Sequence, residues 1–343
     1  MKPFKTIDEQ IQILKSRGLN FENEDAARKI LMHYGYYEIV NGYNKFLLSS
    51  GERYRENEKF EHLFAIYRLD RDLQNNVLQV TLEVESLLKT SLSYFIAKEY
   101  GHDEKDYLKR TNYKSGHRLF FPDGRPKKDK NGKDLYEIDS TFRKFKNILK
   151  DNIEPFRHYR EDHGHIPPWI LFKGCSFGNI RHFYQLQTSS IKDSVMRTMM
   201  GFPEEDIFTL TEPAKKVFSD AIFVAQKLRN RAAHGGRIVG YRVDSQNIQF
   251  SDYLFEKLNI TEEQFNEGYG KGNYYSLFAY LQLFDDKRPL VLLSLCTKVA
   301  LDEYFKLYPD DRVLIFESLG FPPKEYDKSN EDIFMGFASY KKR

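Results

Sequence analysis

The stretch TEPAKKVFSDAIFVAQKLRNRAAHGGRIVGYR, residues 211–242, determines the fold that the sequence predicts. Its apolar residues recur at steps of three and four, as on an amphipathic helix with one buried face. Thr211 is a suitable N-cap, and Pro213 suits the first helical turn. Gly235-Gly236 marks the expected end of the helix.

Three polar residues, Arg229, Asn230 and His234, fall together at the expected end of this helix. One interpretation is a solvated helix end, where cations interact favourably with the helix dipole. The other is a metal-independent ribonuclease site. There His234 would transfer protons as the acid or base, Arg229 would stabilise phosphate, and Asn230 would orient the imidazole or the phosphate. A single Arg–His pair offers few groups for both proton transfers, so this hypothesis implies a homodimer with two copies of the site.

The spacing of Arg and His carries almost no specificity by itself. Six of the nine histidines follow an arginine with four to six residues between them. Only His234 combines an Asn directly after the Arg with a strongly apolar helix and a Gly-Gly end. Positions five apart on a straight helix point about 140° apart. Arg229 and His234 can therefore share a face only if the last turn is unwound.

Composition indicates an ordinary globular protein. The 343 residues are 41% hydrophobic and 30% charged, which suits one large domain with additions or two domains. The net charge of +3 is too small to indicate a nucleic-acid binder. Its distribution is uneven, because residues 105–133 hold an excess of Lys and Arg and residues 244–267 an excess of Asp and Glu.

Few features point to metals or membranes. The two cysteines, Cys175 and Cys296, lie far apart and indicate neither a disulfide framework nor a zinc site. His163-x-His165 has no third ligand in register and is interpreted as part of a polar loop. The opening MKPFKTIDEQ has no apolar signal region, and the apolar run 289–296 is too short to span a bilayer. A cytoplasmic protein without metal, cofactor or membrane partner is expected.

The organisation is predicted to be mostly α. An N-terminal helical segment, 1–57, precedes a helical domain, 58–305, and a loose C-terminal tail, 306–343. Residues 59–100 contain no Gly or Pro and predict one long helix, or two with a kink near Asn75-Asn76. Other helices are expected at 6–18, 24–34, 36–47, 140–156, 169–172, 176–187, 190–200, 204–209 and twice within 274–308.

Two segments interrupt the helical domain. Residues 102–139 form a basic insertion, read as an exposed loop or hairpin with Lys127 and Lys128 at its tip. Aromatic residues alternate there with cations, which favours phosphate and base contacts over a merely solvated face. Residues 238–272 form an irregular acidic excursion.

The sequence resembles a known family. Leu228–His234, followed by Arg237, resembles the RN-x-x-x-H box of HEPN ribonucleases. The chain as a whole resembles the Abi-like abortive-infection family of bacteria, the AbiD/AbiF group. The matching segments are Glu9-Gln10, Arg17-Gly18-Leu19, Tyr36-Tyr37 to Gly42-Tyr43, Tyr67–Leu73, Glu83–Thr90 and Trp169 to Ser176-Phe177-Gly178.

The resemblance implies a HEPN-like helical bundle, anti-phage defence and RNA as target or partner, including a structured small noncoding RNA in some relatives. It also implies a place near the Arg–His site for Glu85. Arg231, Arg237, Lys127 and Lys128 are candidate phosphate contacts, the last two on charge alone. Two alternatives to an endoribonuclease stay open: a non-catalytic RNA-binding protein, and a toxin or interaction module without RNA chemistry.

Overall fold

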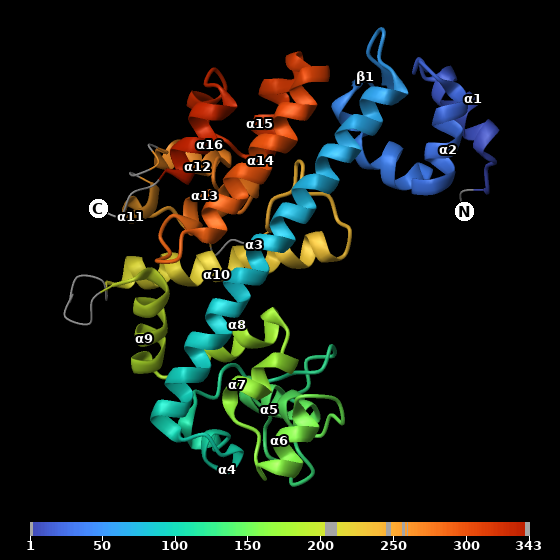
Figure 1. Cartoon of the computed structure of the whole chain (residues 1–343). Helices are drawn as coiled ribbons and strands as arrows, with labels where there is room; N and C mark the ends of the chain where they lie inside the picture. The colour runs from blue at the N-terminus through green and yellow to red at the C-terminus, as the bar shows by residue number, and fades with distance from the viewer. Residues whose placement is uncertain (1–2, 203–210, 245–247, 256–257, 259, 340–343) are drawn as a thin grey trace.

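The structure is a computed structural model that describes residues 3–202, 211–244, 248–255, 258 and 260–339, and these residues are mostly helical (Figure 1). The predicted mostly-α fold is therefore confirmed. The helix expected at 204–209 lies outside the described residues. Within the described part of the chain, none of the helices is both long enough and apolar enough to cross a bilayer.

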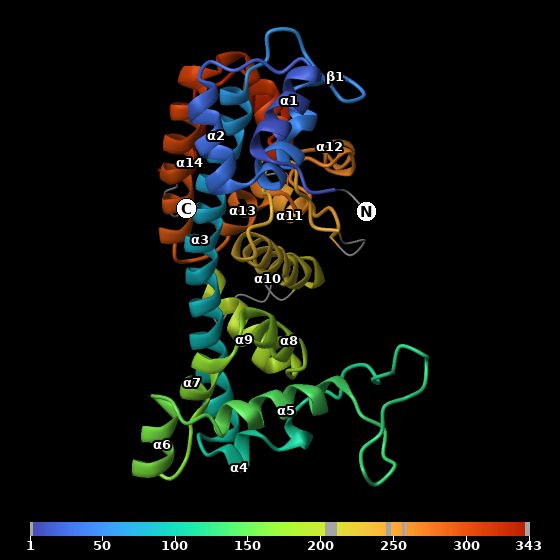
Figure 2. The ribbon, with the colours of Figure 1, turned by 90° about the vertical axis from the view of Figure 1, so that its right-hand side faces the viewer.

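One helix, α3 (Phe60–Tyr100), runs through most of the length of the molecule (Figures 1 and 2). It is continuous, so the kink considered near Asn75-Asn76 is absent from it. Helices α9 (Ser189–Met200), α10 (Glu212–Ala233) and α14 (Arg288–Leu307) all pack along it. Packing on several sides explains why α3 buries residues from Phe60 to Ile96 without an uninterrupted polar stripe.

Helix α10 crosses α3 near its middle (Figure 1). Its N-cap is Thr211, whose hydroxyl accepts the N–H of Ala214 at 3.4 Å, as the sequence predicts. Helices α8 (Phe177–Gln185) and α9 lie on one side of α10, and α13 (Tyr274–Leu281) lies on the other (Figures 1 and 2). The helix that carries the Arg–His motif is thus held between two groups of helices.

The N-terminal segment covers the upper end of α3 (Figure 1). It contains α1 (Ile7–Ser16), α2 (Glu24–Tyr34) and a two-stranded antiparallel hairpin, β1 (Leu48–Ser50) and β2 (Arg53–Tyr54). The helix expected over 36–47 is present over 36–46 but is irregular: a π-helical turn, Tyr37–Asn41, is joined through residues 42–43 to a 3-10 turn, Asn44–Phe46.

Short helices surround the opposite end of α3. They are α4 (Glu104–Tyr107), the 3-10 turn Arg110–Asn112, α5 (Glu137–Leu149), α6 (Phe156–Asp162), α7 (Pro168–Leu171) and the 3-10 turn Phe172–Gly174. Helix α6 ends at Asp162, and the loop expected at His163-x-His165 follows it.

The basic insertion projects as an arm from this end (Figure 2). Where a loop or hairpin is expected, it is an arm with two turns rather than one. The N–H groups of Leu119, Lys127 and Leu135 donate in a cycle to the carbonyls of Leu135, Leu119 and Lys127, at 2.8–2.9 Å. Three short segments are thereby joined by two turns, at Gly124 and Gly132, both with positive φ. Placing Lys127 and Lys128 at the tip is therefore wrong, because they lie in the middle segment between the two turns.

The C-terminal region is helical. After the short α11 (Asp252–Phe255) and α12 (Glu262–Glu267) come α13, α14, the 3-10 turn Pro309–Asp311, α15 (Arg312–Leu319), the 3-10 turn Pro323–Glu325 and α16 (Asn330–Ala338). The expectation of a loose tail is wrong for the described part of 306–343. Phe316 and Phe334 are buried completely, and α16 packs on α14.

Candidate functional site

The Arg–His motif ends in a Schellman turn. Helix α10 stops at Ala233, and His234 is the C-cap. Gly236 N–H donates to the carbonyl of Arg231 at 2.8 Å, and Gly235 N–H donates to that of Ala232 at 2.9 Å. Gly235 has φ +67, a conformation that glycine adopts without strain. The turn between Arg229 and His234 therefore stays helical, with His234 N–H donating to the carbonyl of Asn230 at 3.2 Å, and the helix unwinds only after the motif.

Arg231 stabilises the loop that follows. Its Nε donates to the carbonyl of Arg237 at 3.0 Å, and its guanidinium lies 4.9 Å from the ring centroid of Tyr241. A Cβ on Gly236 would lie 2.5 Å from Arg231 Cδ, so glycine is needed where this side chain crosses. Arg237 donates to the carbonyl of Gly42 in the N-terminal segment. Both candidate phosphate contacts thus have one structural partner already.

A buried carboxylate on α3 fixes the same loop. Asp70 Oδ1 accepts the N–H groups of Ile238 at 2.8 Å and Val239 at 2.6 Å. Its Oδ2 accepts the Tyr43 hydroxyl and the Gln74 amide, each at 2.7 Å. Burial raises the pKa of Asp70, and the donors from Val239, Tyr43 and Gln74 oppose that rise. The side chain joins α3, the N-terminal segment and the loop after the motif.

Arg229 faces a buried ion pair on α3. Glu85 and Lys89 are one turn apart, and Lys89 Nζ lies 2.7 Å from Glu85 Oε1. Arg229 Nε lies 3.9 Å from Glu85 Oε2, and neither of these two atoms has a hydrogen-bond partner. The Glu85 side chain is only 8% exposed, whereas that of Arg229 is 28% exposed. Glu85 thus lies beside the motif, where the resemblance placed it, and Arg229 keeps donors toward solvent.

Asn230 and His234 complete the end of the helix. Arg229 Nη1 donates to Asn230 Oδ1 at 3.3 Å, and His234 is exposed. Arg71 of α3 also reaches this corner: its Nη1 lies 3.7 Å from the position of a Cβ on Gly235. That nitrogen donates to Gln74 Oε1 at 2.8 Å. Two cations of α3 therefore meet α10 at different points: Arg71 near Gly235, and Lys89 through Glu85 near Arg229.

Lys127 and Lys128 are in the arm, which projects from the opposite end of α3 to the N-terminal segment (Figure 2). Lys127 Nζ lies 5.4 Å from the ring centroid of Phe121. Neither lysine forms an ion pair within the described residues, whereas Arg118 pairs with Asp134 at 2.6 Å. The arm thus presents lysines that are free to meet an anion.

Sequence reasoning missed Asp70, Arg71 and Lys89. A signal existed for each: Lys89 follows Glu85 by four residues, and Gln74 lies three and four residues after Arg71 and Asp70. These spacings place pairs on one helix face. They do not reveal that the face meets α10 rather than water.

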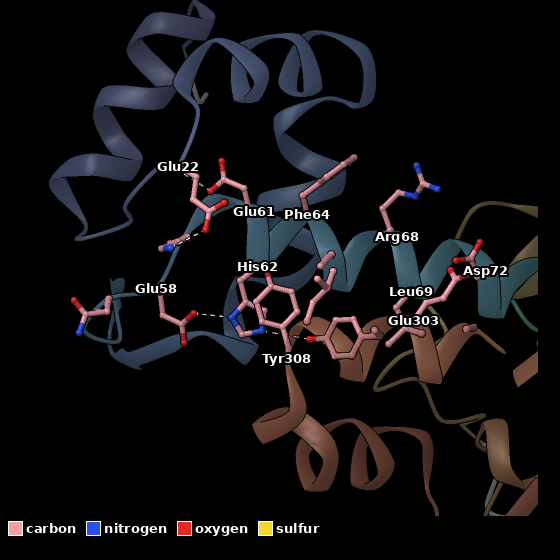
Figure 3. Close-up of a pocket in the computed structure, with 16 residues that line it drawn as sticks. Glu22, Glu58, Glu61, His62, Phe64, Arg68, Leu69, Asp72, Glu303 and Tyr308 are labelled. Carbon is pink, nitrogen blue, oxygen red and sulfur yellow. Dashed lines mark hydrogen bonds and ion pairs between the residues drawn. The ribbon is translucent and has the colours of Figure 1, made fainter. Parts of the chain in front are cut away.

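A cavity of about 750 Å³ lies elsewhere, between the start of α3, the N-terminal segment and α14 (Figure 3). Its acidic lining includes Glu22, Glu61, Asp72 and Glu303, which does not suit phosphate. His62 lies in its wall and stacks on Tyr308 with ring centroids 3.9 Å apart (Figure 3).

Both ring nitrogens of His62 meet carboxylates. Nδ1 lies 2.8 Å from Glu58 Oε2 and Nε2 lies 2.6 Å from Asp311 Oδ2. Burial lowers the pKa of His62, but Asp311 and Glu58 outweigh burial and raise it above the ordinary value. The imidazole therefore connects α3 to the turn before α15. These contacts with Glu58 and Asp311 indicate a structural role for His62.

No group of three or more His, Cys, Asp or Glu side chains in the described residues is arranged to hold a metal ion. His163 and His165 are consistent with this: His165 Nδ1 contacts the carbonyl of His163 at 2.9 Å.

Comparison with known proteins gives one family. The model of the family described as Abi-like protein matches residues 29–239, more than half of the chain. The matched range includes α3, the arm and the whole of α10 with the loop to Val239. No curated protein and no solved structure matches the chain significantly.

Proposed function

The chain belongs to the Abi-like family, which suggests a role in abortive-infection defence, and we propose that it serves this role by binding RNA and cutting it without a metal. The α10 site would be of the HEPN type and act in the cytoplasm. The observation that carries the proposal is the exposed His234 at a fixed helix end, five residues after an arginine that approaches the buried Glu85 only to 3.9 Å.

Each residue of the motif has a chemical role in such a reaction. Imidazole is the side chain best suited to proton transfer near neutral pH, so His234 would accept or return the proton of the 2′-hydroxyl reaction. Arg229 would bind the phosphate and stabilise its developing charge. Asn230, held by Arg229 through its Oδ1, keeps its amide N–H groups to orient the phosphate or the imidazole.

The buried pair on α3 supports this role for Arg229. Glu85 already shares its charge with Lys89 at 2.7 Å and approaches Arg229 only to 3.9 Å. Arg229 is therefore oriented by Glu85 without being neutralised by a bidentate pair. One chain offers a single exposed imidazole at this site, so we propose that two copies meet as a homodimer to provide both an acid and a base.

The test compares the purified protein with His234→Ala on a labelled single-stranded RNA of 20 nucleotides, in EDTA. Loss of general acid–base catalysis should slow cleavage by about 100-fold or more, with affinity unchanged. The products of the unmutated protein should carry 2′,3′-cyclic ends. His163→Ala is the matched control, because His163 is also exposed and lies outside the site.

Each outcome identifies a function. Binding that weakens steeply with salt, without cleavage by the unmutated protein, would indicate a non-catalytic ribonucleoprotein, its partner a structured small RNA. Equal cleavage by the unmutated protein and His234→Ala would refute the assignment of the site. Absence of any RNA binding would indicate a toxin or interaction module.

A further inference from the structure

A second cationic feature lies near the beginning of α10, toward the other end from His234. A cavity of about 880 Å³ opens where α8, α9 and α10 meet. Four cations line it: Lys114, Arg181, Lys192 and Lys215. A cavity of this size accommodates a nucleotide.

The acidic residues of the lining are mostly engaged. Asp193 lies 3.3 Å from Lys215 Nζ, and Glu137 accepts the N–H of His117 at 3.0 Å. Glu212 lies at the rim, with 89% of its side chain exposed. Arg181, Lys192 and Lys114 are left without an ion-pair partner among the described residues.

Arg181 shows the need for an anion most clearly. Its Nε is buried and has no hydrogen-bond partner within the described residues. Its guanidinium lies 5.1 Å from the ring centroid of Phe223 on α10. Burial lowers the pKa of Arg181, yet guanidinium stays charged in proteins. A partly buried cation whose Nε has no partner is costly, and a bound anion removes that cost.

The lysines of the cavity also indicate a binding site for an anion. Burial lowers the pKa of Lys192, and the charges of Lys114 and Lys215 lower it further. Like charges so close repel one another until an anion binds between them.

The cavity and the Arg–His motif share one face of α10. Ser219, Phe223, Lys227, Asn230 and His234 recur at steps of three and four, and Ser219 lines the cavity. Lys227 Nζ lies 5.5 Å from the Phe223 ring centroid, on which Arg181 also packs. The helical rise places Asn230 about 16 Å from Ser219 along α10. An aromatic ring between cations is the arrangement with which proteins bind single strands.

We propose that the cavity between α8, α9 and α10 binds phosphate groups of an RNA strand that runs along α10 from the Arg229–His234 site, with Phe223 as the base-stacking surface between them. This inference rests on the proposed function. It adds a second subsite, and it makes affinity depend on strand length.

The experiment measures affinity by fluorescence anisotropy for a 20-nucleotide single-stranded RNA and for the dinucleotide UpU. Arg181→Gln with Lys192→Gln should weaken binding of the longer RNA about tenfold and reduce the salt slope by about 1.4, as expected for two lost contacts to a single strand. Binding of UpU at the distant motif should be unchanged. Lys98→Gln with Lys306→Gln removes the same charge from exposed positions elsewhere and should have no effect. Lys114→Gln, an exposed position, repeats the test should the double variant fail to fold.

The outcomes separate this inference from the proposed function. If the unmutated protein binds and cuts RNA while the cavity variants bind it equally well, the subsite is refuted and the function stands. If inorganic phosphate binds the cavity, detected by phosphorus NMR, with no change in RNA affinity, the anion is a free one and the RNA path is refuted. If the unmutated protein binds no RNA, both fail together.

Discussion

Replacing Asp70 by Asn should destabilise the protein and loosen the loop behind the Arg–His motif. The carboxylate receives four donors at 2.6–2.8 Å: two N–H groups of the loop on Oδ1, and Tyr43 and Gln74 on Oδ2. Asn keeps one oxygen, so one pair of donors would face an amide NH2 instead of an acceptor.

The magnitude follows from these contacts. Hydrogen bonds to charged groups contribute about 1.5–3 kcal/mol each, so losing two costs about 3–6 kcal/mol. Burial raises the pKa of Asp70, and a neutral amide avoids the desolvation cost of the charge. This relief offsets part of the loss. The net loss is about 2–4 kcal/mol, which for a chain of 343 residues lowers Tm by roughly 3–6 °C.

The assay is urea unfolding followed by circular dichroism, with Asp72→Asn as the matched control. Asp72 is two residues away and only half-buried, and no donor reaches it within 3.5 Å in the described residues. Burial raises its pKa, so its replacement should leave stability unchanged or slightly increased. A loss below 1 kcal/mol for Asp70→Asn, or an equal loss for Asp72→Asn, would refute the assignment of Asp70 as the anchor of the loop.

Two further predictions concern a titrating contact and the arm. The pKa of His62 is raised in the folded protein, so the stabilisation that the protonated imidazole contributes is complete below the ordinary value of 6.5 and is lost as pH rises through the folded pKa. The difference in unfolding free energy between the unmutated protein and His62→Gln should therefore be larger at pH 6 than at pH 9. A difference that does not change with pH would exclude a contribution from the charge of His62. Lys127→Glu with Lys128→Glu should lower affinity for single-stranded RNA and flatten its salt dependence, measured by fluorescence anisotropy; unchanged affinity would remove the arm from the binding surface.

Local patterns in the sequence predict the main helices well. The apolar period and the N-cap at Thr211 give α10, and a break-free run of residues gives α3. The same rules fail where tertiary packing decides whether a segment is ordered. Residues 306–343 contain Pro322 and Pro323 and a basic end, which favours a loose tail, yet Phe316 and Phe334 bury themselves against other helices.

The site shows the same limit at the level of single residues. The motif itself is visible as Arg, Asn and His before two glycines. Its supports are not, because Asp70 binds residues 168 and 169 positions away, and Glu85 faces Arg229 across two helices. Long-range contacts of this kind leave no period in a sequence. Arg231 shows the opposite difficulty. Its charge made it a candidate phosphate contact, but its Nε donates to the carbonyl of Arg237 and its guanidinium lies over the ring of Tyr241.

Under the proposed function, the geometry around Arg229 would explain how the site remains stable before RNA binds. A guanidinium poised for phosphate is a charge without its ligand, and complete pairing with a carboxylate would compete with RNA. Glu85 avoids both extremes, because Lys89 takes its Oε1 at 2.7 Å and Arg229 stays 3.9 Å from Oε2. Attraction at that distance holds the arginine in place, while its other donors remain available. Removing Lys89 would let Glu85 pair fully with Arg229, so under the proposed function the lysine would be a positioning residue that keeps the arginine available to phosphate.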